Sequence, residues 1–131
     1  MGSLLAVRSL LLPLALLLQS ARHSFRMNPL SGTSGDKVQL QCETLSSSST
    51  GCSWLRLAPG KVVPTFLLFI SLKREAAEDL DPKRFRGERI SSSTYRLTLQ
   101  NFREEDEGYY YCVVTRNSAL FFSPFVPVFL P

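Results

Sequence analysis

The sequence predicts an all-β domain, a sandwich of two antiparallel sheets, from three observations. Short segments rich in β-branched and aromatic residues alternate with turn signals at roughly ten-residue spacing, which is typical of an all-β chain. Cys42, Trp54 and Cys112 stand at the spacing of a disulfide between two sheets with an indole packed beside it. In the string Asp106-Glu-Gly-Tyr-Tyr-Tyr-Cys112, Tyr110 comes two residues before the second cysteine. Together these features indicate an immunoglobulin variable-type (V-set) β-sandwich.

Residues 1–22 predict a signal peptide that precedes the sandwich. Arg8 comes before an apolar run at 10–18, and small or polar residues follow, so we expect cleavage at 21–23. A helix of that run would reach about 14 Å, too short for a hydrocarbon core of about 30 Å. We therefore expect the variable-type domain at residues 24–130. The chain is expected to be secreted if complete, or to lie outside the plasma membrane if it is part of a longer protein.

Composition argues for a binding module. The hydrophobic content of 44% suits a packed domain and excludes a disordered chain. The formal net charge of +4 falls to about +2 once Arg8 and Arg22 leave with the leader, and no basic stripe predicts nucleic-acid binding. The single histidine, His23, lies at the cleavage region, so we expect no enzyme. Without a Cys-x-x-Cys pair or a histidine cluster, we expect no metal and no cofactor.

The strands are expected in the order of a variable-type domain. Alternating apolar and polar residues predict that the strands at Lys37–Glu43 and Tyr95–Leu99 each bury one face. The strands at Thr65–Ser71 and Leu120–Phe129 are apolar on both faces, so their outer face also needs a cover, for example another chain. The expected strands are A near Phe25–Leu30, B at Lys37–Glu43, C at Ser53–Leu57, C′ at Thr65–Ser71, D near Arg89–Ser92, E at Tyr95–Leu99, F at Tyr109–Thr115 and G at Leu120–Phe129.

Export would place the three cysteines in an oxidising compartment. The variable-type spacing assigns the disulfide to Cys42 and Cys112 and leaves Cys52 spare. Cys52 has the parity of Trp54, so we favour an inert buried thiol over an intermolecular bridge.

The residues before the second cysteine predict a structural network. Trp54 is expected in the core, and Tyr110 occupies the tyrosine-corner position, where its hydroxyl bonds the backbone a few residues upstream. Asp106 is expected to pair with Arg84. The acidic run 104–107 is therefore interpreted as a solvated turn rather than a cation site.

Strand F should also carry an outward aromatic patch. Tyr109 and Tyr111 alternate with Tyr110 and Cys112, so they point away from the core. An exposed aromatic patch on a small domain indicates a partner site, and we expect dimerisation through it. The predicted interface residues are Phe69, Tyr109, Tyr111, Phe121 and Phe125.

Four strings carry a family resemblance across the chain: Gly51-Cys-Ser-Trp-Leu55, Pro64-Thr-Phe-Leu-Leu68, Phe102-Arg-Glu-Glu-Asp-Glu-Gly-Tyr-Tyr110 and Phe125-Val-Pro-Val-Phe-Leu-Pro131. With them the sequence resembles the ectodomains of the co-receptor alpha chains of cytotoxic T cells. The resemblance implies a surface glycoprotein that forms a homodimer or pairs with a related beta chain. It also implies binding of class I MHC, in support of antigen recognition, and an intracellular kinase recruited by a tail absent from this chain.

The resemblance places the MHC contacts in three loops and near the amino terminus. The cations among these residues would steer the domain towards an acidic loop on class I MHC. The implied binding residues are Arg26, Ser48, Ser49, Thr50, Ser71, Lys73, Arg74, Arg116, Asn117 and Ser118. The alternatives are another variable-type adhesion or antigen-receptor domain, or a soluble decoy form.

Overall fold

The computed structural model describes residues 25–29, 37–44, 51–71, 75–76, 80–116 and 118–131. The predicted signal peptide lies outside these residues, so it stays a prediction. No helix within the described residues is long and apolar enough to span a membrane.

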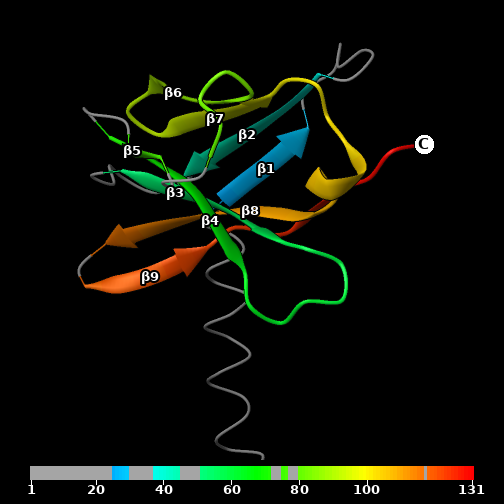
Figure 1. The fold of residues 1–131 in the computed structure, drawn as a ribbon. Helices are drawn as coiled ribbons and strands as arrows, with labels where there is room; N and C mark the ends of the chain where they lie inside the picture. The colour runs from blue at the N-terminus through cyan, green and yellow to red at the C-terminus, as the bar shows by residue number, and fades with distance from the viewer. Residues whose placement is uncertain (1–24, 30–36, 45–50, 72–74, 77–79, 117) are drawn as a thin grey trace, which may run out of the picture.

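Two antiparallel sheets form the domain, as the sequence predicts (Figure 1). The first sheet has the order β1-β2-β7-β6, and the second has the order β10-β8-β3-β4-β5, with β9 also paired to β8. The strands of the first sheet are β1 (Phe25–Pro29), β2 (Val38–Thr44), β7 (Thr94–Leu99) and β6 (Phe85–Ser91). Those of the second are β3 (Cys52–Leu57), β4 (Thr65–Ile70), β5 (Glu75–Ala76), β8 (Gly108–Arg116), β9 (Ala119–Phe122) and β10 (Val126–Val128).

The core lies between the two sheets and follows the predicted alternation. In β2, Leu40 and Cys42 are fully buried, and in β7 Tyr95, Leu97 and Leu99 are buried as well. Side chains of opposite parity in these strands, such as Gln39 and Gln41, lie on the outer surface and are half-buried. Alternate burial therefore fixes the register of both strands against the core.

A β-bulge in the pairing of β4 with β3 interrupts the alternation of core-facing and outward-facing side chains in β4. Its pairing with β3 shifts after Trp54, which pairs with Leu68, while Leu55 pairs with Phe66. Leu67 is the extra residue, and both Leu67 and Leu68 are buried in the core. The bulge leaves Phe66 and Phe69 on the outer side, which explains why this strand is apolar on both faces.

Two expected strands differ from the structure. Strand D begins at Phe85 rather than near Arg89, because the Phe85 ring enters the core and the backbone at Gly87 packs tightly against β4. A Cβ on Gly87 would come within 2.6 Å of the Leu68 side chain, so a larger residue would require the buried Leu68 and Ile70 side chains to shift. The expected strand G is interrupted and forms β9 and β10.

The interruption of strand G occurs at Ser123-Pro124-Phe125. The Ser123 amide donates to the Cys112 carbonyl oxygen at 2.8 Å. In return the Cys112 amide donates to the Ser123 hydroxyl oxygen at 2.8 Å, in place of a backbone carbonyl. The Ser123 side-chain oxygen therefore replaces a backbone acceptor where β9 ends.

Candidate functional site

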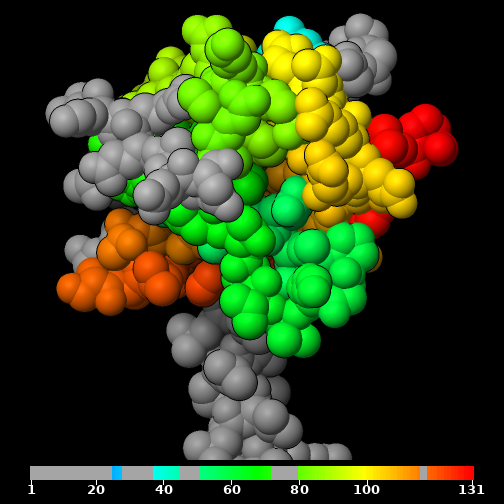
Figure 2. All heavy atoms as spheres, in the orientation of Figure 1, coloured from blue at the N-terminus to red at the C-terminus, as the bar shows by residue number. Residues whose placement is uncertain are grey.

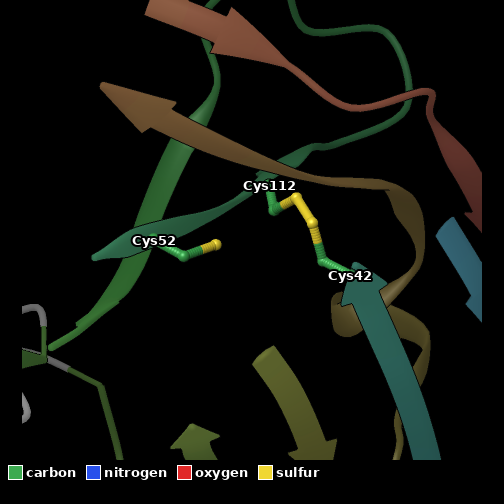
Figure 3. A group of neighbouring side chains, drawn as sticks. All are labelled: Cys42, Cys52 and Cys112. Carbon is green, nitrogen blue, oxygen red and sulfur yellow. A yellow bond between two sulfur atoms is a disulfide. The ribbon is translucent and has the colours of Figure 1, made fainter. Parts of the chain in front are cut away.

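The Cys42–Cys112 disulfide joins the two sheets and links residues 70 positions apart in the sequence (Figure 3). Trp54 is fully buried and pairs with Cys112 in register, so its indole fills the core beside the bridge. A constraint on a loop of this length stabilises the fold by about 4 kcal/mol in the chain-entropy account. The loops of the domain are thus held on a rigid frame.

Cys52 is a buried free thiol on β3, and its sulfur points towards the disulfide (Figure 3). The Cys52 thiol donates to the Ser53 carbonyl oxygen at 3.6 Å, and burial raises the pKa of the thiol. The sulfurs of all three cysteines lie within 4.8 Å of one another. Two of them are already joined in the disulfide, so this cluster does not offer a thiolate metal site.

A network around Asp106 holds the turn before β8. The Asp106 carboxylate is 3% exposed and receives a short contact from the Arg84 guanidinium. Arg56 lies 3.8 Å from the other carboxylate oxygen, and the Arg103 amide donates to Asp106 at 2.9 Å. The Tyr110 hydroxyl donates to the Asp106 carbonyl oxygen, and burial raises the pKa of this tyrosine to about 12. The expected partners Arg84, Asp106 and Tyr110 therefore meet at one place.

Three of the four acidic side chains at residues 104–107 already have partners. Asp106 is held by the two guanidinium groups, and Glu107 accepts a hydrogen bond from the Leu130 amide at 2.7 Å. Glu105 pairs with Arg103 at 3.3 Å, and Glu104 is exposed to solvent in the 3-10 turn η1 (Glu104–Asp106). The turn is a structural support for β8 rather than a cluster of converging ligands.

The outer side of the six-stranded sheet presents the predicted aromatic side chains, with one correction. Phe121 pairs with the buried Val114 and packs against the core, so the prediction that it belongs to the outer patch is wrong. Phe122 pairs with Val113 on the outer side and is 48% exposed. Tyr109, Phe69 and Phe125 lie on the outer side, and Tyr109 and Phe125 are exposed.

Tyr111 lies beneath the exposed rings of this surface. Its ring lies 4.8 Å from that of Phe125 and 6.4 Å from that of Phe122, measured between ring centroids. These neighbours leave Tyr111 only 6% exposed although it points away from the core, and burial raises its pKa. Beside it, Tyr109 contacts Phe129 edge-to-face at 5.6 Å. We call the set the aromatic face: Phe66, Phe69, Tyr109, Tyr111, Phe122, Phe125 and Phe129.

Exposed apolar side chains are unevenly distributed between the two sheets. Of the ten large apolar residues exposed among those described, nine belong to the six-stranded sheet, its connecting turns or the segment after β10. Ile90 on β6 is the exception. The turn at 58–64 and the hairpin carrying β9 both project at the margin of this sheet (Figure 2). A surface of this kind on a small domain is typical of a partner site.

Four of the predicted MHC-binding residues lie at one end of the sandwich. Ser71 follows β4, Arg116 ends β8, and Ser118 is exposed in the turn before β9. Ser118 has a φ of 64°, a left-handed conformation that closes a tight hairpin. Arg26 on β1 is exposed and pairs with Glu43 near the end of β2, which leads to the same end. Ser48, Ser49, Thr50, Lys73, Arg74 and Asn117 lie outside the described residues.

Comparison with known proteins identifies the family. Residues 27–130 match the immunoglobulin V-set domain. The chain is 44% identical over 98 residues to the CD8 alpha chain of Rattus norvegicus and 41% identical over 100 residues to that of Mus musculus, each match covering 72% of this chain. The solved swine CD8aa homodimer is 41% identical, with a TM-score of 0.73, and the match covers 82% of this chain and 98% of that one. This chain belongs to the V-set domains of the CD8 alpha type.

The matched part is a fraction of the rodent relatives. The chain spans 41% of the rat protein and 40% of the mouse protein. The CD8 alpha-type resemblance therefore concerns the variable-type ectodomain.

Sequence reasoning missed three residues of the aromatic face in this CD8 alpha-type domain, Phe66, Phe122 and Phe129, and it also missed Arg56 and Glu107. A continuous strand G would place Phe121 on the outer side, whereas the register shift between β9 and β10 places Phe122 there. Phe129 joins the aromatic face through Tyr109, and Glu107 holds the Leu130 amide beside it. Ser123-Pro124 is the sequence signal that could have revealed the break, because serine and proline are both common in turns and loops.

Proposed function

We propose that this chain is the ectodomain of a T-cell surface co-receptor that dimerises through the aromatic face and binds class I MHC through the loop end. The single observation that carries the proposal is the aromatic face itself. It lies on the outer side of a sheet whose inner side already packs a complete core. Because the second apolar side has no cover within the described residues, a second chain is the natural cover.

The partner we favour for this face is a second copy of the chain. The swine relative, which is 41% identical, was solved as a homodimer. Exposed Phe and Tyr rings are the side chains enriched at protein interfaces. Burial of the exposed half of a ring such as Phe125 contributes roughly 1 kcal/mol, so stable pairing requires the whole face. A related beta chain with a similar surface is the alternative partner.

Class I MHC is proposed as the ligand of the loop end. Arg26 on β1, Ser71 after β4, Arg116 at the end of β8 and Ser118 before β9 lie at that end, which suits a composite binding surface. Positive charge on Arg26 and Arg116 would attract an acidic loop and raise the association rate. Polar loops on a rigid sandwich suit a weak, hydrated contact. The match to V-set domains of the CD8 alpha type supports a binding role at the outer cell surface.

Surface plasmon resonance over immobilised class I MHC tests this ligand. We expect the double substitution Asn117→Ala with Ser118→Ala to abolish binding, because the family resemblance assigns both residues to the MHC contact and Ser118 is exposed in the turn before β9. Glu104→Ala, exposed in η1 at the opposite end of the sheet, is the matched control and should bind like the parent.

Two results would count against this assignment. Retained binding by the hairpin variant would move the contact away from the predicted loops. Failure of both the parent and the Glu104→Ala control to bind would favour a different variable-type adhesion or antigen-receptor role.

A further inference from the structure

The outer side of the four-stranded sheet, opposite the aromatic face, carries a separate groove. It has a volume of about 370 Å³, within the range of small-ligand sites, which is roughly 300–1,000 Å³. Strands β2, β7 and β6 form its floor, and the turn before β6 forms one wall. The residues that matter for its chemistry are Lys37, Gln39, Lys83, Arg86, Glu88 and Gln100.

Charge in this groove is predominantly positive. Arg86 pairs with Glu88 at 3.2 Å, so the one acid that lines the groove is already matched by one cation. Lys37 and Lys83 are exposed, and neither forms an ion pair with another described residue. Two ammonium groups from different elements therefore remain to attract a negative ligand.

The rest of the lining is polar. The Gln39 side-chain amide donates to the hydroxyl oxygen of the buried Thr98 at 3.4 Å, and the exposed Gln100 comes directly after the end of β7. Amide side chains can donate hydrogen bonds to sugar hydroxyls and accept from them. The groove lacks the aromatic or large aliphatic anchor on which protein interfaces usually depend. A small, polar and negatively charged ligand fits this lining better than a protein segment does.

We propose that this groove, here called the basic groove, binds an acidic oligosaccharide through a carboxylate or sulfate group. Lys37 and Lys83 would hold the anion as flexible point charges. Gln39 and Gln100 would contact the adjoining sugar hydroxyls. The groove lies on the sheet that does not carry the aromatic face, so the proposed dimer leaves it open. This site is independent of the proposed co-receptor function.

The test is an NMR titration of the isotope-labelled, exported chain with four probes at low salt. These are 3′-sialyllactose, a sulfated heparin-derived tetrasaccharide, neutral lactose and a hexaglutamate peptide. We expect amide shifts around Lys37, Lys83 and Gln100 with at least one acidic oligosaccharide and none with lactose. The sialylated and sulfated probes distinguish the carboxylate source from the sulfate source. Added salt should weaken the binding.

Variants distinguish specific binding in the groove from non-specific attraction by the positive charge of the whole domain. Lys37→Gln with Lys83→Gln should weaken binding roughly fivefold to tenfold. Lys61→Gln with Arg103→Gln removes the same net charge from exposed positions outside the groove and should leave binding unchanged. Gln39→Ala with Gln100→Ala should weaken binding of the acidic oligosaccharide but leave the binding of inorganic sulfate, titrated as a fifth probe, unchanged.

Three outcomes would overturn the proposal. The first is equal weakening by the groove pair and the control pair, which would indicate non-specific charge attraction. The second is binding of lactose as strong as that of the acidic sugars, or no binding of any oligosaccharide. The third is binding of hexaglutamate at least as tight as that of both acidic sugars, which would assign the groove to an acidic protein segment.

Discussion

Asp106 illustrates how single side chains secure this domain. Its carboxylate is buried between the guanidinium groups of Arg84 and Arg56, and its carbonyl accepts the Tyr110 hydroxyl. Removing one partner of a buried ion pair is strongly destabilising because the other charge stays behind without compensation. The sequence predicted the contacts with Arg84 and Tyr110. Arg56 was missed because its approach to Asp106 depends on the pairing of β3 with β8.

We expect Asp106→Asn to lower the free energy of unfolding by about 3 kcal/mol, because two half-buried guanidinium groups lose their buried counter-charge. Urea denaturation followed by tryptophan fluorescence measures the change. Glu104→Gln, two residues away and exposed, should change the free energy by less than about 0.5 kcal/mol. Equal stabilities for the two variants would contradict the structural role assigned to Asp106.

Tyr110 predicts how stability responds to alkaline pH. Its pKa rises from 10.0 to about 12 on folding, chiefly through burial, so the folded chain keeps a proton that the unfolded chain loses. The contribution is therefore fully present below pH 10 and is lost as the pH rises from 10 to 12, by about 2 kcal/mol. Chemical denaturation across this range should show that decline.

Tyr110→Phe is the control for this pH dependence. The variant should be less stable at neutral pH, yet its stability should fall less steeply between pH 10 and 12. Cys52 is unchanged in both proteins, so its own ionisation cancels in the comparison. An identical slope in the two proteins would contradict the assignment to Tyr110.

Among the strands, those at the end of the chain are the ones that the sequence predicted least well. Alternation predicted β2 and β7 well because each packs one face on the core. Phe121 and Phe125 have the same parity, so one continuous strand would place both on the same side. The break at Ser123 shifts the phase, and Phe121 turns inward while Phe125 stays outside. The short strand β5 was not predicted from the sequence. It has only two residues, which form a strand by pairing with β4, and two residues are too few to show an alternating pattern.

The break between β9 and β10 depends on the Ser123 hydroxyl, which accepts the buried Cys112 amide at 2.8 Å. We expect Ser123→Ala to destabilise the domain by about 2 kcal/mol, because that amide loses its acceptor while remaining buried. Thermal or urea unfolding of the variant measures the loss. Ser92→Ala, exposed in the turn between β6 and β7, should be nearly neutral. A loss for Ser123→Ala no larger than that of Ser92→Ala would contradict this role of the hydroxyl.

The whole molecule has two outer surfaces of opposite character. The four-stranded sheet is polar outside and carries the basic groove, whereas the six-stranded sheet carries the aromatic face. The sequence predicted the aromatic face because two of its strands are apolar on both sides. The sequence placed Phe121 in the aromatic face, where the structure has Phe122. The ring contacts that bury Tyr111 could not be predicted, because they depend on where the chain bends after the break at Ser123.

Dimerisation through the aromatic face is the central claim, and sedimentation at micromolar concentration tests it most directly. The parent chain should sediment as a dimer. Phe125→Asp should sediment as a monomer, because it places a charge beside Tyr111 at the centre of the face. Ile90→Asp, a similarly exposed apolar position on the opposite sheet, should remain a dimer. A monomeric parent, or a dimer that survives Phe125→Asp, would contradict the claim.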